Sequence, residues 1–229
     1  MTEFFVPGAP DIPIVLRRSA RARRISLRVS RLDGRVTLTL PNRVPESEAL
    51  EFAQSKADWL MRNMAARPEA LQVALGTELP FQGELLTVGA GQERSVRRDG
   101  EALLVPSGAR VGARVQAFLK TEARNRLVEA CDGYSRDLGR PYARITLRDT
   151  RSRWGSCSSA GALMFSWRLV MAPEEVLHYV AAHEVAHLAQ MNHSKAFWDE
   201  VHRLFGPHKA ERAWLRQHGE KLHRYRFED

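Results

Sequence analysis

The feature of this chain that constrains it most is the segment His-Glu-Val-Ala-His at residues 183–187. On an α-helix, residues four positions apart lie on one face, so His183 and His187 would present both imidazoles to the same point. Two neutral imidazole nitrogens with that spacing can bind one Zn²⁺ at about 2.0–2.1 Å. Glu184 stands beside the first histidine, where it can act as a base without ligating the metal. The segment therefore predicts a helix that carries two metal ligands and a general base.

A catalytic zinc site needs a third protein ligand and an open position for water. His193 follows His187 by six residues, which leaves room for the chain to leave the helix and turn back. Asn192 tolerates the left-handed conformation that ends many helices, so it is suited to that turn. We predict His183, His187 and His193 as metal ligands, Glu184 as the catalytic base and Zn²⁺ as the cofactor.

The residues before the motif favour a helix. Pro173 can occupy the first helical position, and Glu174 and Glu175 would lie in the first turn, where acidic side chains stabilise a helix. Apolar residues that supply a buried face follow them, namely Val176, Leu177 and Val180. We expect the motif helix to extend over about residues 173–191.

Length and composition are typical of a globular protein. A chain of 229 residues can form one large domain or two small ones, and its 44% hydrophobic and 27% charged residues are ordinary proportions. No run approaches the roughly 18 apolar residues of a membrane helix. Residues 1–13 lack the order of a secretory signal, and Cys131 and Cys157 do not make a disulfide framework. We therefore expect a cytoplasmic, reduced protein without a membrane segment.

The formal net charge of +8 is unevenly distributed, because residues 1–40 hold eight arginines and only three acidic residues. A dense arginine run can bind the phosphates of a nucleic acid. The alternative is an edge strand whose alternate charged residues prevent pairing with other chains. The alternation of Ile25, Leu27 and Val29 with polar residues favours that alternative. Nucleic acid is therefore a candidate partner, and an edge strand is the simpler interpretation.

Hydrophobic periodicity divides the first 106 residues into two β segments with one helix between them. Asp-Gly pairs at Asp33-Gly34 and Asp99-Gly100 indicate hairpin turns. We predict residues 1–106 as a β-rich N-terminal region. Its expected elements are strands at 14–16, 25–29, 36–40, 84–88, 95–98 and 102–105, a helix over about 45–64, and a loop over 67–76.

From residue 107 onward the pattern is mainly helical. We predict residues 107–229 as the catalytic region, and the whole chain as an α+β protein. Ser194 is placed to cap a helix that Gly206-Pro207 ends. The expected elements are helices over about 111–138, 173–191, 195–205 and 208–217, with strands at 145–148 and 162–170.

Several segments of this second region occur in the order found in a known family. They are Arg153-Trp-Gly-Ser-Cys-Ser158, Trp167-Arg168-Leu169-Val170, Ala172-Pro173, the motif at 183–187, and Asn192-His193-Ser194 with Phe197-Trp198. Together they resemble the YgjP-like metallopeptidases, predicted zinc hydrolases related to the SprT/WLM group, most strongly over about residues 140–218. The resemblance implies a compact zincin-like domain with a β-rich N-terminal part. It also implies His183, His187 and His193 as zinc ligands and Glu184 as base.

Alternatives remain for the ligand set. Glu200 or Glu211, from a later helix, is the main competitor for the third position. Cys157 as a fourth ligand would close the site and make the zinc structural. The histidine spacing also resembles the metzincin pattern, but Gln190 stands where that pattern has glycine, and no methionine follows Met191.

The segment 153–158 allows two interpretations. Gly155 within a strand-like run indicates a bulge or the close approach of another backbone. The segment then borders the active-site cleft. Alternatively it is a turn in which Trp154 packs on the motif helix.

We predict a zinc-dependent hydrolase, most simply a metallopeptidase that cleaves polypeptides with a zinc-activated water and Glu184 as general base. Candidates for stabilising the oxyanion are His208, Tyr179 and Arg168. Some relatives in the wider group resembled here act on proteins crosslinked to DNA, which fits the basic N-terminus. Two other functions stay open, a non-peptidase zinc amidohydrolase and a nucleic-acid-associated protein with a structural zinc site.

Overall fold

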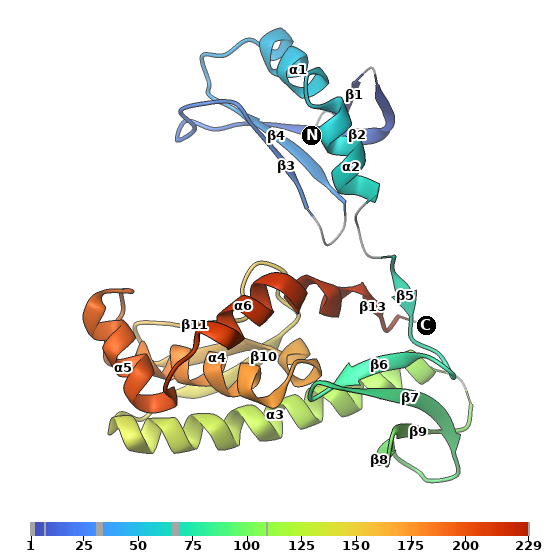
Figure 1. Ribbon diagram of the computed structural model, residues 1–229, viewed down its shortest axis with the longest axis vertical. Helices are drawn as coiled ribbons and strands as arrows, with labels where there is room; N and C mark the ends of the chain where they lie inside the picture. Colours follow the sequence, from blue (N-terminus) through green and yellow to red (C-terminus); the bar gives the residue numbers. More distant parts are fainter. Residues whose placement is uncertain (1–2, 7, 31–33, 66–68, 109, 229) are drawn as a thin grey trace. The chain divides into compact units, whose positions relative to one another are not determined.

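The computed structural model describes residues 3–6, 8–30, 34–65, 69–108 and 110–228 (Figure 1). The chain divides into two compact units, residues 1–69 and 70–229. The expected boundary after residue 106 falls inside the second unit. Strand residues such as Leu86 there share one core with Leu119 of the long helix that follows. Strands and helices are present in both units, so the α+β class is confirmed.

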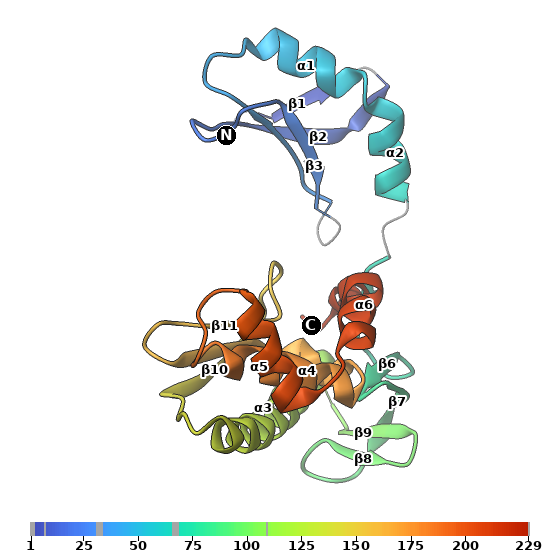
Figure 2. The same cartoon turned by 60° about the vertical axis from the view of Figure 1, so that its left-hand side comes forward.

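The first unit is a four-stranded sheet with two helices on one face (Figure 2). The strand order is β1-β2-β4-β3, and β2 runs parallel to β4. Ala49, Ala53 and Leu60 from the helices pack on alternate residues of the central strands, which makes a core of its own. The elements are β1 (Glu3–Val6), β2 (Ala9–Arg18), β3 (Ser26–Val29), β4 (Val36–Leu40), α1 (Glu46–Gln54) and α2 (Ala57–Ala65).

The first hairpin predicted from the sequence is present. Strand β3 pairs antiparallel with β4, from Ser26 opposite Thr39 to Val29 opposite Val36. Asp33 of its turn lies outside the described residues, whereas Gly34 has a φ of 72°, a conformation that glycine adopts without strain.

The prediction of a single helix over residues 45–64 was wrong, because the helix is interrupted between α1 and α2. The Ser55 hydroxyl donates to the Phe52 carbonyl at 2.8 Å. The Lys56 amide bonds to the Ala53 carbonyl, three residues back instead of four. A serine hydroxyl competes for the carbonyls that continue a helix, which explains the break.

The second unit begins with a four-stranded sheet in the order β6-β7-β9-β8. The hairpin expected at Asp99-Gly100 is confirmed, because β8 pairs antiparallel with β9. Strand β6 had no clear sequence signal. It turns into β7 through Gln82 and Gly83, which both have positive φ, and Gly83 lies against Pro173. The elements are β5 (Leu71–Gln72), β6 (Glu78–Phe81), β7 (Glu84–Gly91), β8 (Arg97–Asp99) and β9 (Ala102–Pro106).

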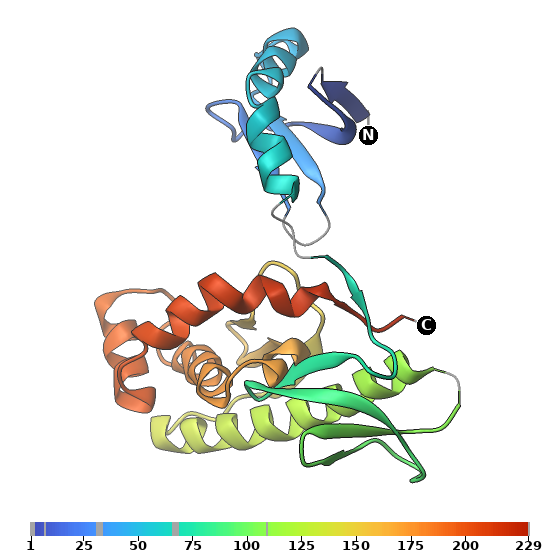
Figure 3. The same ribbon diagram turned by 45° about the vertical axis from the view of Figure 1, so that its right-hand side comes forward.

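The remainder of the second unit is built on one long helix, α3, which covers the expected span of Val111–Leu138. Its first half packs under the β6–β9 sheet through Val115 and Leu119, and its second half packs through Leu127 and Cys131 on α4 (Figure 3). The other elements are β10 (Arg144–Arg148), β11 (Gly155–Cys157), β12 (Ala162–Ser166), η1 (Trp167–Met171), α4 (Glu174–Ala186), α5 (Lys195–Phe205), α6 (Lys209–His218), η2 (Gly219–Arg224) and β13 (Tyr225–Arg226).

The strand expected over residues 162–170 is correct only as far as Ser166. Strand β12 pairs parallel with β10 and antiparallel with β11. Residues 167–171 then form a 3₁₀ turn, η1, in which every side chain is buried. The turn distributes these side chains. Trp167, Val170 and Met171 join the core under the β6–β9 sheet, Leu169 joins the core around α4, and Arg168 pairs with Asp149.

Arg168 of η1 ties the C-terminal segment to the sheet. Its side chain is buried, with a residue exposure of 5%. Nε and Nη2 donate to the two Asp149 oxygens at 2.7 and 3.0 Å, and Nη1 donates to the carbonyls of Leu222 and Tyr225. Burial raises the pKa of Asp149, but the hydrogen bonds and charge of Arg168 outweigh burial and hold that pKa below its usual value.

Replacing Asp149 by Asn should lower the free energy of unfolding by about 1–3 kcal/mol, since the buried Arg168 loses its charged partner and solvent reduces the loss at the partly exposed carboxylate. The folded-state pKa is the lower one, so this stabilisation is full above about pH 4 and is lost as the pH falls through that pKa. Urea unfolding at several pH values measures it. The control Asp199→Asn removes an exposed pair with Lys195 and should cost less than about 0.5 kcal/mol. Equal losses in the two variants would contradict the prediction.

Candidate metal centre

Helix α4 holds the first two motif histidines, and it is buried along most of its length. Leu177, Val180, Ala181 and Val185 belong to the core that α4 shares with α3. Because these contacts fix the helix about its own axis, they also fix the direction of the side chains on its opposite face.

The helix is shorter than the sequence predicted, since it ends at Ala186 and not near Met191. His187 is the C-terminal cap residue, and its Nδ1–H donates to the Gln190 carbonyl at 2.9 Å. The Leu188 amide bonds to the carbonyl three residues back, at Val185. The chain after Ala186 therefore forms a tighter turn in place of the helical turn expected up to Met191. The hydrogen bond from the His187 imidazole to the Gln190 carbonyl closes this turn.

The three predicted histidines meet at one point. One ring nitrogen each from His183, His187 and His193 lies within 4.8 Å of the other two. The Nε2 atoms of His183 and His193 are 3.2 Å apart. Two nitrogens that ligate one Zn²⁺ tetrahedrally at about 2.0–2.1 Å lie about 3.3 Å from each other. The spacing therefore fits a shared metal ion.

Hydrogen bonding and burial leave these rings ready to act as ligands. His187 uses Nδ1–H for the Gln190 carbonyl, so the Nε2 lone pair is free, an arrangement typical of metal-ligating histidines. Burial, together with the charges of the other two histidines, lowers the pKa of His183 to about 3. Burial also lowers the pKa of His187. Both rings therefore favour the neutral form, which is the form that binds metal.

The turn that brings His193 back differs from the one expected. Among the described non-glycine residues only Gln82 and Arg110 have positive φ, so Asn192 is not left-handed. Its Oδ1 instead accepts the Ser194 amide at 3.2 Å, because an asparagine side chain can close a turn on its own backbone. Ser194 then caps α5 as predicted, by accepting the Phe197 amide.

Helix α5 supplies an apolar floor beneath the histidines. The Phe197 ring is fully buried, and its centroid lies 4.9, 4.4 and 4.8 Å from those of His183, His187 and His193. Such contacts restrict the imidazoles to one orientation and limit the access of water from that side.

Glu184 lies on α4 beside β11 and is 6% exposed. A Cβ atom added to Gly155 would stand 2.5 Å from its Cγ and from its Oε1. The close approach predicted at Gly155 is therefore present, although the group that approaches is a side chain and not a backbone. Burial raises the pKa of Glu184 to about 8, and the charge of Arg153 acts in the opposite direction.

The segment 153–158 contains the short strand β11 and is not a turn, and its place at the edge of a substrate cleft stays a prediction. Its Gly155 borders Glu184, while Trp154 anchors the segment in the core. The Trp154 ring lies 5.5 Å from that of His223, and Cζ2 would stand 2.8 Å from a Cβ atom at Gly219. The C-terminal segment thus holds β11 against α4.

The competing ligands do not join the histidines within the described part of the chain. Glu200 accepts a hydrogen bond from Arg203 at 2.8 Å. Glu211 lies outside the histidine group, with Oε2 buried and unpartnered among the described residues. Cys157 donates to the Ser158 carbonyl at 3.3 Å, and burial followed by the charge of Glu184 raises its pKa to about 11. No fourth protein ligand therefore closes the described group.

The three candidates for the oxyanion have different surroundings. Arg168 donates four hydrogen bonds, to Asp149 and to the carbonyls of Leu222 and Tyr225, so we do not retain it as a donor to the oxyanion. Tyr179 stacks on His208 with ring centroids 5.5 Å apart, and the Tyr179 ring lies 5.9 Å from that of His183. Both are therefore near the histidine group.

Trp198 completes this stack and carried no sequence signal of a role in the site. Its ring lies 5.4 Å from His208 on one side, and Arg212 lies 4.6 Å over the ring. Its centroid is 5.6 Å from His183 and 5.7 Å from His193. Residues of α4, α5 and α6 contribute to the stack. The sequence pattern of any one of these helices therefore predicts only an aromatic residue of the core, and not its place in the stack.

Gly155→Ala should lower the free energy of unfolding by about 1–3 kcal/mol, because the added methyl overlaps Glu184 and must displace it or β11. Urea unfolding measures the loss. The matched control is Gly133→Ala in α3, where a Cβ atom meets nothing within 4 Å and alanine favours the helix. If the two variants were equally stable, the contact between Gly155 and Glu184 would not be close.

Residues 23–218 match the family described as YgjP-like, metallopeptidase domain, and no curated protein matches. The chain is 22% identical to the metallopeptidase zymogen of Pyrococcus abyssi abylysin, with a TM-score of 0.36 over 41% of this chain and 93% of that one. Within the described residues, no helix is both long and apolar enough to span a bilayer. Because the family match extends over most of its length, the chain belongs to the YgjP-like metallopeptidase family.

Proposed function

We propose that the protein is a zinc-dependent peptidase that hydrolyses amide bonds in polypeptides, with His183, His187 and His193 as zinc ligands. The gathering of three histidine nitrogens beside the buried Glu184 carries this proposal. Three neutral histidines without a fourth protein ligand are typical of catalytic zinc sites. A Zn²⁺ ion held there supplies Lewis-acid activation of water and of the substrate carbonyl.

Glu184 is the proposed general base. Burial brings its pKa to about 8, near the range in which a general base works best at neutral pH, and the positive charge of Arg153 favours the ionised carboxylate. Glu184 accepts a proton from the attacking water. It returns that proton to the amine nitrogen as the C–N bond breaks.

Tyr179 is the proposed hydrogen-bond donor to the oxyanion, and His208 positions the Tyr179 ring. Burial raises the pKa of Tyr179 to about 12, so its hydroxyl stays protonated at neutral pH. The Nδ1–H of His208 donates to the Gly206 carbonyl at 3.1 Å, which with the stack on Tyr179 fixes the ring. Fixed donors stabilise developing charge better than mobile ones.

Two alternatives differ from this proposal in what they predict. A structural zinc site would be closed by a fourth protein ligand, and X-ray absorption would then show no exchangeable oxygen. A non-peptidase amidohydrolase would hydrolyse small amides and leave unfolded proteins intact. Incubation of the zinc-loaded protein with unfolded polypeptides, followed by mass spectrometry of the products, separates a peptidase from both.

His183→Ala, His187→Ala and His193→Ala should each lower zinc occupancy strongly, because each leaves the ion with two protein ligands. Zinc content after dialysis measures the effect. The control is His202→Ala, an exposed histidine outside the group, which should keep full zinc. Full zinc in the His193 variant would remove that residue from the ligand set.

Glu184→Gln keeps size and shape but cannot accept a proton. Zinc should stay bound, and turnover should fall by about 10²–10⁴-fold. Glu175→Gln, an exposed change in the first turn of α4, is the matched control and should leave both zinc and turnover unchanged. Parent-level hydrolysis by the Glu184 variant would disprove the mechanism.

A second candidate function, nucleic-acid binding, concerns the first unit. Its arginine surface consists of Arg17, Arg21, Arg23, Arg24 and Arg28, which are all exposed. None of these five side chains makes a hydrogen bond or ion pair with another described residue. In contrast, Arg18 pairs with Glu46.

Strand pairing places part of this surface on the open face of the sheet. Arg17 lies opposite Thr39, and Arg28 lies opposite Thr37. Paired residues point to the same side, and the alternate residues, such as Leu38, face the helices. Strand β3 is an edge strand, as the sequence predicted. Edge protection explains Arg28 but not the arginines of the β2–β3 connection, which supports binding of phosphates.

Replacing Arg21, Arg23 and Arg24 together by Gln should weaken binding of a 20-base-pair duplex and reduce the log–log salt slope by about 2–3, since each phosphate contact contributes about 0.9. Fluorescence anisotropy across salt concentrations measures both.

The matched control removes the same charge elsewhere in the unit, at the exposed Arg43, Lys56 and Arg62. It should bind with the parent slope. Equal weakening in both triple variants, or no duplex binding by the parent at low salt, would leave only the edge-strand interpretation of the arginines.

A further inference from the structure

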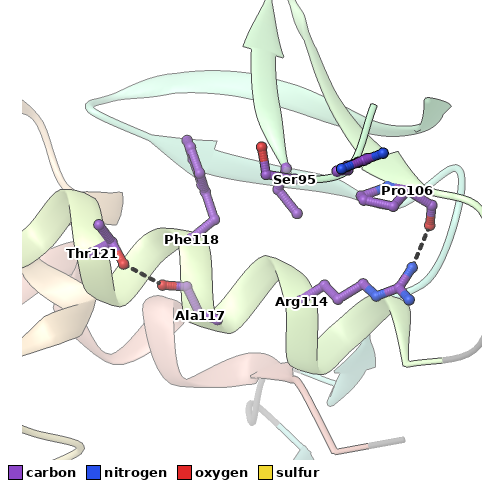
Figure 4. Close-up of a pocket in the computed structure, with 8 residues that line it drawn as sticks. Ser95, Pro106, Arg114, Ala117, Phe118 and Thr121 are labelled. Carbon is purple, nitrogen blue, oxygen red and sulfur yellow. Dashed lines mark hydrogen bonds between the residues drawn. The ribbon is translucent and has the colours of Figure 1, made fainter. Parts of the chain in front are cut away.

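A pocket of about 400 Å³ lies between the first half of α3, the connection from β7 to β8 and the end of β9 (Figure 4). Phe118, Val96 and Pro106 form its apolar part, and Arg94 and Arg114 line it with charge. Phe118 and Val96 also pack on the core under the β6–β9 sheet. The apolar wall is therefore held in place by the fold.

Arg114 is fixed at one end of this pocket. Its Nη1 donates to the carbonyls of Pro106, at 2.6 Å, and Ser107, at 3.2 Å. Figure 4 shows the side chain reaching from α3 to Pro106. Its Nε and Nη2 make no hydrogen bond with any described residue, and no described carboxylate pairs with it. The Nε–Nη2 edge of an oriented guanidinium is thus available.

The charge around the pocket is uncompensated. No acidic residue lines it. Glu93, which precedes the pocket residue Arg94, pairs with Arg97 at 2.8 Å, and Arg97 also lies 3.4 Å from Asp99. Arg94 is exposed and has no ion-pair partner among the described residues. Because α3 has no acidic residue in its first turn, its dipole adds to the positive potential.

We propose that this pocket binds a small organic anion, a monocarboxylate with an apolar or aromatic body. The Nε–Nη2 edge of Arg114 matches both oxygens of a carboxylate, which a guanidinium binds in bidentate fashion. The body of the ligand lies along Phe118, where an aromatic ring can stack or pack edge-on. The volume is in the range of pockets that enclose small ligands.

The site is separate from the metal centre. No residue that lines the pocket belongs to the histidine group. Phe118 lies thirteen residues before Cys131 on α3, which at 1.5 Å per residue is about 20 Å, and Cys131 packs in the core that holds Ala181 and Val185 of the motif helix. Binding here therefore needs neither zinc nor Glu184, and its test is independent of the peptidase proposal.

The carboxylate has two natural sources, a free organic acid and the C-terminus of a peptide. Titration with 4-phenylbutyrate represents the first, and N-acetyl-Ala-Phe the second. The matched uncharged compounds are 4-phenylbutanol and the amide of the same dipeptide. The proposal is supported if either acid binds saturably and its uncharged counterpart does not bind. The acid that binds identifies the source of the carboxylate.

Two variants test the pocket itself by calorimetry or NMR. Arg114→Gln should weaken binding of the acid at least tenfold, whereas Arg124→Gln, an exposed change on the same helix outside the pocket, should not. Ala117→Leu fills the pocket, retains both arginines and should also abolish binding. The Ala117 variant retains the hydrogen bonds of Arg114 to Pro106 and Ser107, so it tests the pocket even if the Arg114 variant misfolds.

The proposal is overturned by any of three results. One is absence of saturable binding of both acids up to about 10 mM, the limit of a useful interaction. Another is equal affinity for an acid and its uncharged counterpart. The third is parent-like binding by Ala117→Leu.

Discussion

The packing of α4 is the constraint on which the rest of the site depends. Helix α3 covers one side of α4, and β11 lies against Glu184 on another. A buried carboxylate is costly unless charge or hydrogen bonding compensates it. Gly155 brings β11 to van der Waals contact, so Glu184 has little freedom to swing out to water. The same packing aims His183 and His187 at one point.

The third histidine depends on interactions of another kind. Nothing in α4 continues to His193, and the chain returns through the Gln190 and Asn192 hydrogen bonds and the cap at Ser194. Phe197 then supports all three rings from below. The centre is thus assembled from one buried helix, one hydrogen-bonded turn and one aromatic floor.

The arginines of this protein differ in whether the fold has already paired them. The first unit has its own core and carries, on a sheet face and a connection, arginines whose side chains have no partner among the described residues. In the second unit, the oriented Arg114 lies toward the opposite end of α3 from the metal centre. Arg168, in contrast, already has partners within the fold, because its guanidinium donates hydrogen bonds to Asp149 and to two backbone carbonyls. An arginine is available for ligands only where the fold has not already paired it.

The sequence by itself determined the elements whose signals are local. The 3.6-residue period of α3, the Asp-Gly hairpin at residues 99–100 and the four-residue spacing of His183 and His187 each concern neighbours along the chain. Sequence reasoning failed where distant groups compete with local preference, as at η1, where the strand gives way to a 3₁₀ turn whose five side chains are all buried, in two different cores and an ion pair. Only the tertiary structure decided that Gly155 meets Glu184, that Trp198 stacks on His208 and that Arg168 is unavailable. Those contacts join elements far apart in the chain, and no local pattern records which partners packing will bring together.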